Sequence, residues 1–392
     1  MADGNENGRE KRPLTQLAQG GRSQSITGAF VNPPVIHAST VLFPDVETMR
    51  PGGQPYTYGR TGTPTTEALE SAMTELEGAA GTVLCPSGLS AISTALLAVL
   101  GSGDHLLMAD NVYDPARTFA ETVLSRFGVE TTFFDPQIGG GIAALMRDTT
   151  RAVYVESPGS LTFELTDIPA MAAAAHDNGA LLIADNTWAT PFYCKPLGLG
   201  ADISLLAATK YIGGHSDLML GTVSAAPSAY ARLRSTYLTL GLCVGPDDIF
   251  LGLRGLRTLG VRLNHHMRSG LAVARHLDER PEVARVLHPG LPGQPGHALW
   301  QRDMTGASGL FGVVMDGWSQ DKATAFLEAL QIFGLGYSWG GFESLAIPAR
   351  LRRSATDWHA TGPLIRLHVG LEDTEDLIAD LDAAFERVGN LA

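Results

Sequence analysis

The chain has 392 residues, 44% of them hydrophobic and 18% charged, which is typical of a folded protein with a substantial core. A net charge of −13 and the lack of any run of Lys and Arg argue against nucleic-acid binding, because affinity for phosphate backbones depends on clustered basic side chains. The polar opening MADGNENGREKR is unlike a secretory signal and no apolar run reaches the ~20 residues that span a bilayer. Three widely spaced cysteines without a CxxC pair favour free thiols, so a cytoplasmic enzyme is expected.

The first two thirds of the chain divide into an irregular arm and an α/β region. Residues 1–61 show little periodicity and many Gly and Pro residues, which predicts an extended N-terminal arm. Over residues 62–256 short aliphatic runs alternate with helical patterns, which predicts a largely parallel sheet with covering helices. Helical spacing marks residues 89–99, and Asp167 and Gly179 mark the two ends of another helix. The expected strands are 82–85, 105–109, 130–134, 152–156, 180–185, 202–208 and 221–225.

The remaining residues predict a second, smaller domain. A long helix that opens with two aspartates is expected over residues 247–266. Beyond residue 257, short strands mix with helices, and the chain ends in the helical pattern TEDLIADLDAAFERV. We therefore expect an α+β domain over residues 257–392.

A lysine and an aspartate follow two of the predicted strands. The chain has few lysines, and Lys210 lies at the end of the apolar run in AATKYIGGHSD, where open α/β sheets place their ligands. By position alone, a surface lysine at a strand edge is the more ordinary interpretation. Asp185, however, ends the strand ALLIAD in the same way. Pyridoxal phosphate requires this combination, because a lysine forms its Schiff base and a carboxylate keeps its pyridine nitrogen protonated.

Further residues at strand ends match the rest of such a cofactor. CPSGLSAIS (85–93) reads as a strand, a Ser-Gly turn and an amphipathic helix, so the free N–H groups of Gly88 and Leu89 would point at a phosphate. Thr209 would add a hydroxyl, and Tyr113 follows another strand end, where its ring would stack on the cofactor. Each feature alone has an ordinary explanation, such as a helix cap or a loop tyrosine. Together they predict a pyridoxal-phosphate site.

Six motifs carry a resemblance to a known family. The segments YTYGR, SGLSA, DNTWATP, ATKYIGGHSD, YSWGGFESL and LIRLHVGLED resemble the Cys/Met-metabolism family of pyridoxal-phosphate enzymes over nearly the whole chain. YSWGG and ESPGS together resemble its bacterial cystathionine β-lyase branch. The resemblance implies the aspartate aminotransferase-type fold (fold type I). It also implies a carbon–sulfur lyase that converts cystathionine to homocysteine, pyruvate and ammonia.

The resemblance also implies roles for individual residues. Lys210 would be the Schiff-base lysine, Asp185 the partner of the pyridinium nitrogen and Tyr113 the stacking residue. Gly88, Leu89 and Thr209 would hold the phosphate. Tyr58 and Arg60 would reach the phosphate of a neighbouring subunit, which implies a homotetramer built from catalytic dimers. Arg366 would grip the substrate α-carboxylate with help from Ser338, and Trp339 and Tyr237 would be walls of the substrate pocket.

The sequence around Arg366 is compatible with a carboxylate-binding arginine apart from the resemblance, although a solvent-facing strand arginine is the alternative. In LIRLHVG, alternation puts Arg366 on the face opposite Ile365, Leu367 and Val369, away from the most apolar side. A planar guanidinium binds a carboxylate through two parallel hydrogen bonds. Two positions depart from the family pattern: Ala207 replaces a common serine and Ser160 replaces the asparagine of E-x-P-x-N-P, which puts two cofactor contacts of the γ-specific enzymes in doubt.

Other functions stay open at this point. Within the family, cystine or cysteine-S-conjugate β-lyase, methionine γ-lyase, and cystathionine γ-lyase or synthase activities are alternatives. A serine hydrolase is a rival because GYSWG (336–340) matches G-x-S-x-G and Ser338, Asp357 and His368 follow in the right order, although the glycines and proline after Ser338 disfavour the required helix. A cofactor-binding protein without activity is a third possibility. No metal site is expected, because His215 and Asp217 lack an accompanying ligand motif.

Overall fold

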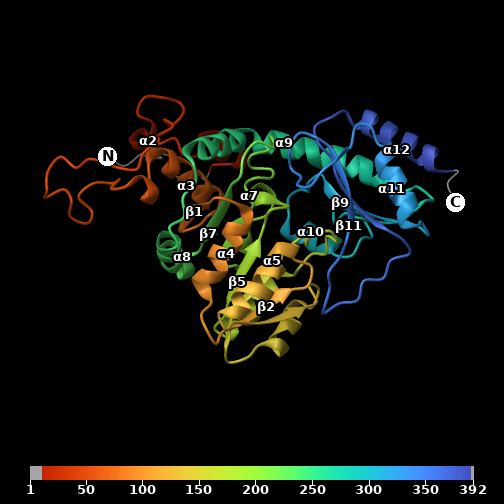
Figure 1. Ribbon diagram of the computed structural model, residues 1–392, viewed down its shortest axis with the longest axis horizontal. Coiled ribbons are helices and arrows are strands. Elements are labelled where there is room, and N and C mark those ends of the chain that lie inside the picture. The colour runs from red at the N-terminus through yellow and green to blue at the C-terminus, as the bar shows by residue number, and fades with distance from the viewer. Residues whose placement is uncertain (1–10, 390–392) are drawn as a thin grey trace.

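Seven strands form the larger sheet of the computed structural model, which describes residues 11–389 (Figure 1). Their order across the sheet is β1-β7-β6-β5-β4-β2-β3, and only β7 runs antiparallel to its neighbours. The expected strands and the mostly parallel sheet are therefore confirmed. The strands are β1 (Gly81–Cys85), β2 (His105–Ala109), β3 (Glu130–Phe134), β4 (Thr150–Glu156), β5 (Leu181–Asp185), β6 (Ile203–Leu206) and β7 (Gly221–Ala225).

Helices cover the larger sheet and begin at side chains that cap them. The hydroxyls of Thr63 and Ser87 and the carboxylate of Asp167 each accept a hydrogen bond from the N–H three residues later, so they start α3, α4 and α6. The covering elements are α3 (Pro64–Glu77), α4 (Gly88–Val99), α5 (Asp114–Phe119) with the π-helical turn η2 (Ala120–Leu124), α6 (Ile168–Asp177), α7 (Thr190–Tyr193) and α8 (Pro227–Thr239). Short 3-10 turns occupy η1 (Gly59–Thr61), η3 (Gly139–Leu145) and η4 (Pro196–Leu199).

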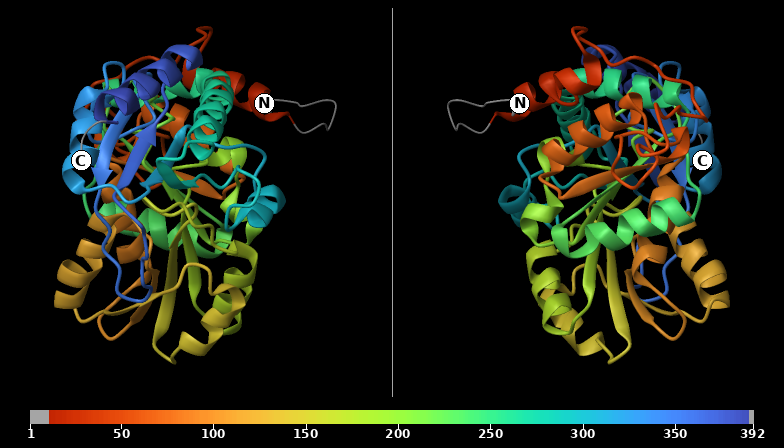
Figure 2. Two further views of the ribbon diagram at one scale, coloured as in Figure 1. Left: turned by 90° about the vertical axis from the view of Figure 1, so that its right-hand side faces the viewer. Right: turned by 90° about the vertical axis from the view of Figure 1, so that its left-hand side faces the viewer.

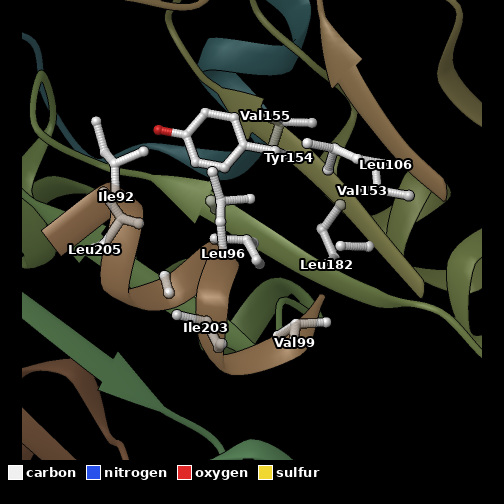
Figure 3. Packing of buried hydrophobic residues seen from close by; sticks show 14 of the residues in the cluster. Ile92, Leu96, Val99, Leu106, Val153, Tyr154, Val155, Leu182, Ile203 and Leu205 are labelled. Carbon is white, nitrogen blue, oxygen red and sulfur yellow. The ribbon is translucent and has the colours of Figure 1, made fainter. Parts of the chain in front are cut away.

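The main core lies between α4 and the centre of the larger sheet (Figure 3). The helical spacing of Ile92, Leu96 and Val99 places these side chains on one face of α4, where they meet the aliphatic side chains of the strands. Because parallel strands are covered on both faces, β1, β2 and β5 read as nearly continuous apolar runs. The packed core fixes the positions of the strand ends, at or near which Asp185 and Lys210 lie.

A long helix, α9 (Pro246–Asp278), joins the larger sheet to a second sheet and crosses the top of the molecule in Figure 1. The second sheet has the order β10-β11-β12-β9-β8 and is antiparallel except for the β10 and β11 pair. Its elements are β8 (Val283–Leu287), α10 (His297–Asp303), β9 (Leu310–Met315), α11 (Gln320–Ala329), β10 (Gly334–Leu335), β11 (Leu345–Ala349), β12 (Leu364–His368) and α12 (Thr374–Val388). The expected boundary at residue 257 falls inside α9, which contacts elements of both layers.

The N-terminal segment differs in part from the expected extended arm, whose first ten residues lie outside the described part. Residues 13–27 form α1 (Pro13–Gln19) and α2 (Gln24–Thr27), and Leu17 and Ile26 are buried against the body of the protein. These helices are too short to show a helical hydrophobic pattern in the sequence, which explains why they were not predicted. Residues 28–58 are largely irregular and extend away from the larger sheet (Figure 1; Figure 2). Within residues 11–389, none of the helices has the length and hydropathy of a membrane span.

Candidate active site

Lys210 lies in a tight turn that follows β6. Its N–H donates to the carbonyl of Ala207 at 3.0 Å, and its own carbonyl accepts from the N–H of Gly214 at 2.8 Å. Arg262 of α9 donates to the carbonyl of Tyr211 at 2.7 Å, so the helix between the two sheets holds this turn. Gly214 has a φ of +71°, and a Cβ there would lie 2.1 Å from Arg262 Nη1. The glycines of YIGGHSD therefore let the arginine approach the turn that carries the lysine.

The Lys210 amine lies between the two sheets. Its Nζ donates a hydrogen bond to Ser338 Oγ at 2.6 Å and lies 5.5 Å from the centre of the Trp339 ring. Burial and the charge of Arg366 lower the pKa of Lys210 to about 8, against the opposing effect of Asp185. An amine with this pKa is neutral far more often at physiological pH than an ordinary lysine. It is therefore suited to act as a nucleophile or a base.

The loop that carries Ser338 is strained and packs closely on the lysine turn. Ser338 has a φ of +76°, a conformation that residues other than glycine rarely adopt. Gly340 has a φ of +84°, and a Cβ there would lie 2.9 Å from the carbonyl carbon of Lys210. The carbonyl of Ser338 accepts a hydrogen bond from Arg366 Nη2 at 2.8 Å. Gly340 thus lets this loop pack on the lysine turn, while the Ser338 carbonyl bonds the arginine.

Asp185 is buried at the carboxyl end of β5. Its Oδ1 accepts hydrogen bonds from the N–H of Thr187 at 2.9 Å and from Thr187 Oγ1 at 2.5 Å, and its Oδ2 lies 3.4 Å from the Tyr154 hydroxyl. Burial raises the pKa of Asp185, although these hydrogen bonds and the charge of Lys210 lower it. Glu156 is its register partner on β4, and burial together with the charge of Asp185 raises the pKa of Glu156 well above its ordinary value. A cation beside Asp185 would stabilise its ionised form.

The start of α4 lies next to the lysine turn. The hydroxyl of Ser87 accepts from the N–H of Ser90 at 3.1 Å, and the N–H groups of the first helical turn have no acceptor within the helix. A Cβ on Gly88 would lie 2.5 Å from the Cβ of Ala207, so only glycine allows this close approach. The hydroxyl of Thr209 is already bonded to the backbone of Leu220. The helix start therefore offers N–H donors beside Lys210.

Arg366 lies on β12 and lines a cavity of about 500 Å³ together with Tyr113 and Trp339. Its side chain is 9% exposed, and burial lowers the pKa of Arg366 to about 10. Among the described residues its Nε has no hydrogen-bond partner. A buried donor without an acceptor is costly, so this guanidinium is prepared for an anion that enters the cavity. As expected, Ile365, Leu367 and Val369 pack into the opposite core.

Tyr113 forms another wall of the same cavity. Its N–H donates to Glu156 Oε2 at 2.7 Å, and this contact fixes the backbone of the loop that follows β2. Burial and Glu156 raise the pKa of the Tyr113 phenol, against the effect of Arg366. The side chain is 47% exposed, so its ring is accessible from the cavity.

Sequence comparisons assign the chain to a family. The profile described as Cys/Met metabolism PLP-dependent enzyme matches residues 14–386. The chain belongs to this family. The cystathionine β-lyase of Escherichia coli K12 is 44% identical over 97% of this chain and 99% of its own, and that of Bordetella avium is 46% identical over 92% and 93%. The crystal structure of metB from Corynebacterium glutamicum matches with a TM-score of 0.91 at 31% identity, covering 98% of this chain and 100% of its own. The predicted family and fold type are thereby confirmed.

The residues of this chain fit the family's cofactor, pyridoxal phosphate. Lys210 supplies an amine with a lowered pKa, and Asp185 supplies a buried carboxylate at the adjacent strand end. The first turn of α4 supplies unpaired N–H groups, as a phosphate requires. The carboxylate at the end of β5, the amine in the turn after β6 and the N–H groups at the start of α4 suit, respectively, a pyridine nitrogen, an aldehyde and a phosphate.

Three of the residues predicted for the site lie apart from it within this chain. Tyr237 is 3% exposed and belongs to the core beneath α8. Tyr58 lies in the exposed arm, and Arg60 Nη1 donates to the carbonyl of Leu238 at 3.0 Å. The structure thus gathers the other predicted residues around one region and leaves these three outside it.

The rival serine hydrolase geometry is not formed. The Ser338 hydroxyl is bonded to Lys210, while His368 Nε2 accepts from the N–H of Gly340 and does not contact the serine. No helix follows Ser338, because the chain continues into β11. Among residues 11–389, no cluster of three potential metal ligands is present.

Four residues of the site region were not singled out from the sequence. Thr187 and Tyr154 bond Asp185, Glu156 bonds the Tyr113 loop, and Arg262 holds the lysine turn. Thr187 follows Asp185 by two residues, so an Asx-type turn was a local signal that could have identified it. The other three act across strands or from α9, and only the register brings them to the site.

Proposed function

We propose that the protein is a carbon–sulfur lyase that cleaves cystathionine by α,β-elimination to homocysteine, pyruvate and ammonia. The observation that carries this proposal is the Lys210 amine, with its pKa lowered to about 8, between the Asp185 carboxylate and the Arg366 guanidinium. The family and the names of the relatives from Escherichia coli and Bordetella avium support it.

The chain's own residues divide the work of such a reaction. Bound pyridoxal phosphate supplies an electron sink for the negative charge that develops at the substrate Cα. Arg366 binds the substrate α-carboxylate through its free Nε, and this contact orients the Cα–H bond. Lys210 Nζ takes the Cα proton, and Asp185 stabilises the positive charge of the pyridine nitrogen. After homocysteine leaves, a three-carbon amino acid fragment remains. Addition of one water molecule to this fragment yields pyruvate and ammonia.

Ser338 has a supporting part in this scheme. Its Oγ holds Lys210 Nζ and its carbonyl holds Arg366 Nη2, so one residue sets the spacing of the base and the carboxylate site. Trp339 and Tyr113 border the cavity, which in this proposal receives the substrate, and we propose that the Tyr113 ring stacks on the cofactor. We propose that Gly88 and Leu89 bind the phosphate through their N–H groups. The Thr209 hydroxyl also binds the phosphate if it gives up its hydrogen bonds to the Leu220 backbone.

We also propose that a second copy of the chain completes the site. Residues 28–58 expose large apolar side chains, among them Phe30 at 80% and Leu42 at 85%, which are ordinarily covered. In this proposal Tyr58 and Arg60 reach the phosphate site of the neighbouring copy, and the assembly is a homotetramer. Residues 62–256 act as the cofactor-binding unit and 257–392 as the smaller unit. The three free cysteines suit a cytoplasmic location.

A product assay with L-cystathionine tests the proposed reaction. Pyruvate and homocysteine in equal amounts are expected, together with ammonia. Release of 2-oxobutyrate and cysteine would instead identify γ-elimination, and the absence of any keto acid from all thioether amino acids would identify a cofactor-binding protein without lyase activity. Lys210→Ala serves as the control, because it removes the base while leaving the cavity intact.

A further inference from the structure

Four arginines line the cavity in front of Lys210, and they differ in their partners. Arg352 bonds Asp114 at 3.2 Å and also Glu121, and Arg353 bonds Glu164 at 2.9 Å. Within residues 11–389, Arg350 has no carboxylate or carbonyl partner, although it lines the same cavity. Within the described residues, the cavity wall therefore presents two arginines without a carboxylate partner, Arg366 and Arg350.

The loop that carries Arg350 is anchored to the larger sheet. The buried carboxylate of Asp110, at the end of β2, accepts hydrogen bonds from the N–H groups of Ser354 at 3.0 Å, Ala355 at 2.9 Å and Thr356 at 2.9 Å. Arg117, which is also buried, pairs with the same carboxylate. Figures 1 and 2 show this loop in blue, descending from the smaller sheet toward α5. Because three consecutive N–H groups bind one carboxylate, the loop is held at the end of β2, beside the cavity.

The position of Arg350 relative to Arg366 suits a substrate that carries a charge at each end. Ile347 lies directly opposite Arg366 in the ladder between β11 and β12. Arg350 is three residues further along, a distance of about 10 Å at the rise of an extended chain. The two α-carbons of cystathionine are joined by five single bonds, three C–C bonds of about 1.5 Å and two longer C–S bonds, and the two carboxylates extend the molecule further. The spacing of the two carboxylates of cystathionine is thus of the same order as the spacing of Arg366 and Arg350, which line the same cavity.

We propose that Arg350 binds the second carboxylate of the substrate and thereby selects thioethers that carry an amino-acid group at both ends. This inference rests on the proposed function, since it assigns the far end of the same substrate. The planar guanidinium forks onto the carboxylate in two parallel hydrogen bonds, which an ammonium group cannot reproduce in the same geometry. The anchor at residues 354–356 limits the movement of the backbone that carries Arg350, whereas its exposed side chain becomes ordered on binding.

The test compares two substrates on the holoenzyme and its variants. L-Cystathionine carries the second carboxylate, whereas S-ethyl-L-cysteine has the same cleavable β carbon–sulfur bond without it. For Arg350→Gln we expect KM for cystathionine to rise about tenfold. Loss of one hydrogen bond between charged groups weakens binding by about this factor. We expect KM for S-ethyl-L-cysteine to change far less. Arg350→Lys should recover part of the loss, and Arg126→Gln, on the surface away from the cavity, is the matched control.

Equal effects of Arg350→Gln on both substrates, or no effect on either, would overturn the inference. The proposed function fails separately if the wild-type enzyme releases no pyruvate from cystathionine. In that case Arg350 is judged by the inhibition of S-ethyl-L-cysteine cleavage by L-cystathionine. An inhibition constant that is the same in wild type and Arg350→Gln then refutes the role of Arg350.

Discussion

The lowered pKa of Lys210 leads to a prediction that can be measured on a single amine. At pH 7 a pKa of about 8 leaves about one Lys210 amine in ten neutral, whereas a pKa of 10.5 would leave about three in ten thousand. The structure therefore predicts a roughly 300-fold larger reactive fraction. Because the charge of Arg366 is the second cause of the shift, Arg366→Leu should raise the pKa of Lys210 and reduce this fraction.

Pulse labelling of the cofactor-free protein measures this pKa directly. Trinitrobenzenesulfonate reacts with neutral amines, and the modified Lys210 peptide is quantified by mass spectrometry between pH 6 and 11, with Nα-acetyl-lysine as the reference. We expect a midpoint near 8 in the wild type and a higher midpoint in Arg366→Leu. A wild-type midpoint near that of the reference amine would refute the reasoning that burial and Arg366 prepare the lysine for its role.

Three further predictions follow from contacts around the site. Asp185→Asn should lower kcat at least 100-fold and weaken retention of pyridoxal phosphate on dialysis, because the charge beside the pyridine nitrogen is lost; unchanged retention and turnover would exclude Asp185 from that role. Gly340→Ala should reduce kcat/KM at least tenfold, because its Cβ would lie 2.9 Å from the carbonyl carbon of Lys210 at a φ of +84°, and wild-type kinetics would contradict this contact. Asp110→Asn should lower the free energy of unfolding by about 3 kcal/mol in urea titrations, because it leaves the buried Arg117 without its charged partner, and a loss under about 1 kcal/mol would contradict the anchor.

The sequence predicted the larger sheet well because local patterns determine it. The aliphatic runs of β1 to β7 are bounded by turn residues, and each buried strand of a parallel sheet has a distinct composition. Lys210 and Asp185 were identified for the same reason, since strand ends in this architecture converge on one edge. The capping role of Asp167 was likewise a local signal.

What the sequence did not predict depends on contacts between distant segments. Glu156 becomes a neighbour of Asp185 only through the register of β4 and β5, and Arg262 reaches the lysine turn from α9. The helix at residues 13–19 was missed because two turns of helix carry too little periodicity to be recognised. Tyr237 was expected in the pocket, yet its ring is buried in the core beneath α8 of the same chain.

The covalent position of the cofactor is the most direct test of the account. Purified enzyme with bound pyridoxal phosphate is reduced with borohydride and digested, and the phosphopyridoxyl peptide is sequenced by mass spectrometry. We expect the label on Lys210 in the wild type and its loss in Lys210→Ala, with the variant still binding the cofactor reversibly. A label on Lys195 or any other lysine, or undiminished labelling of Lys210→Ala, would contradict the assignment on which the proposed reaction depends.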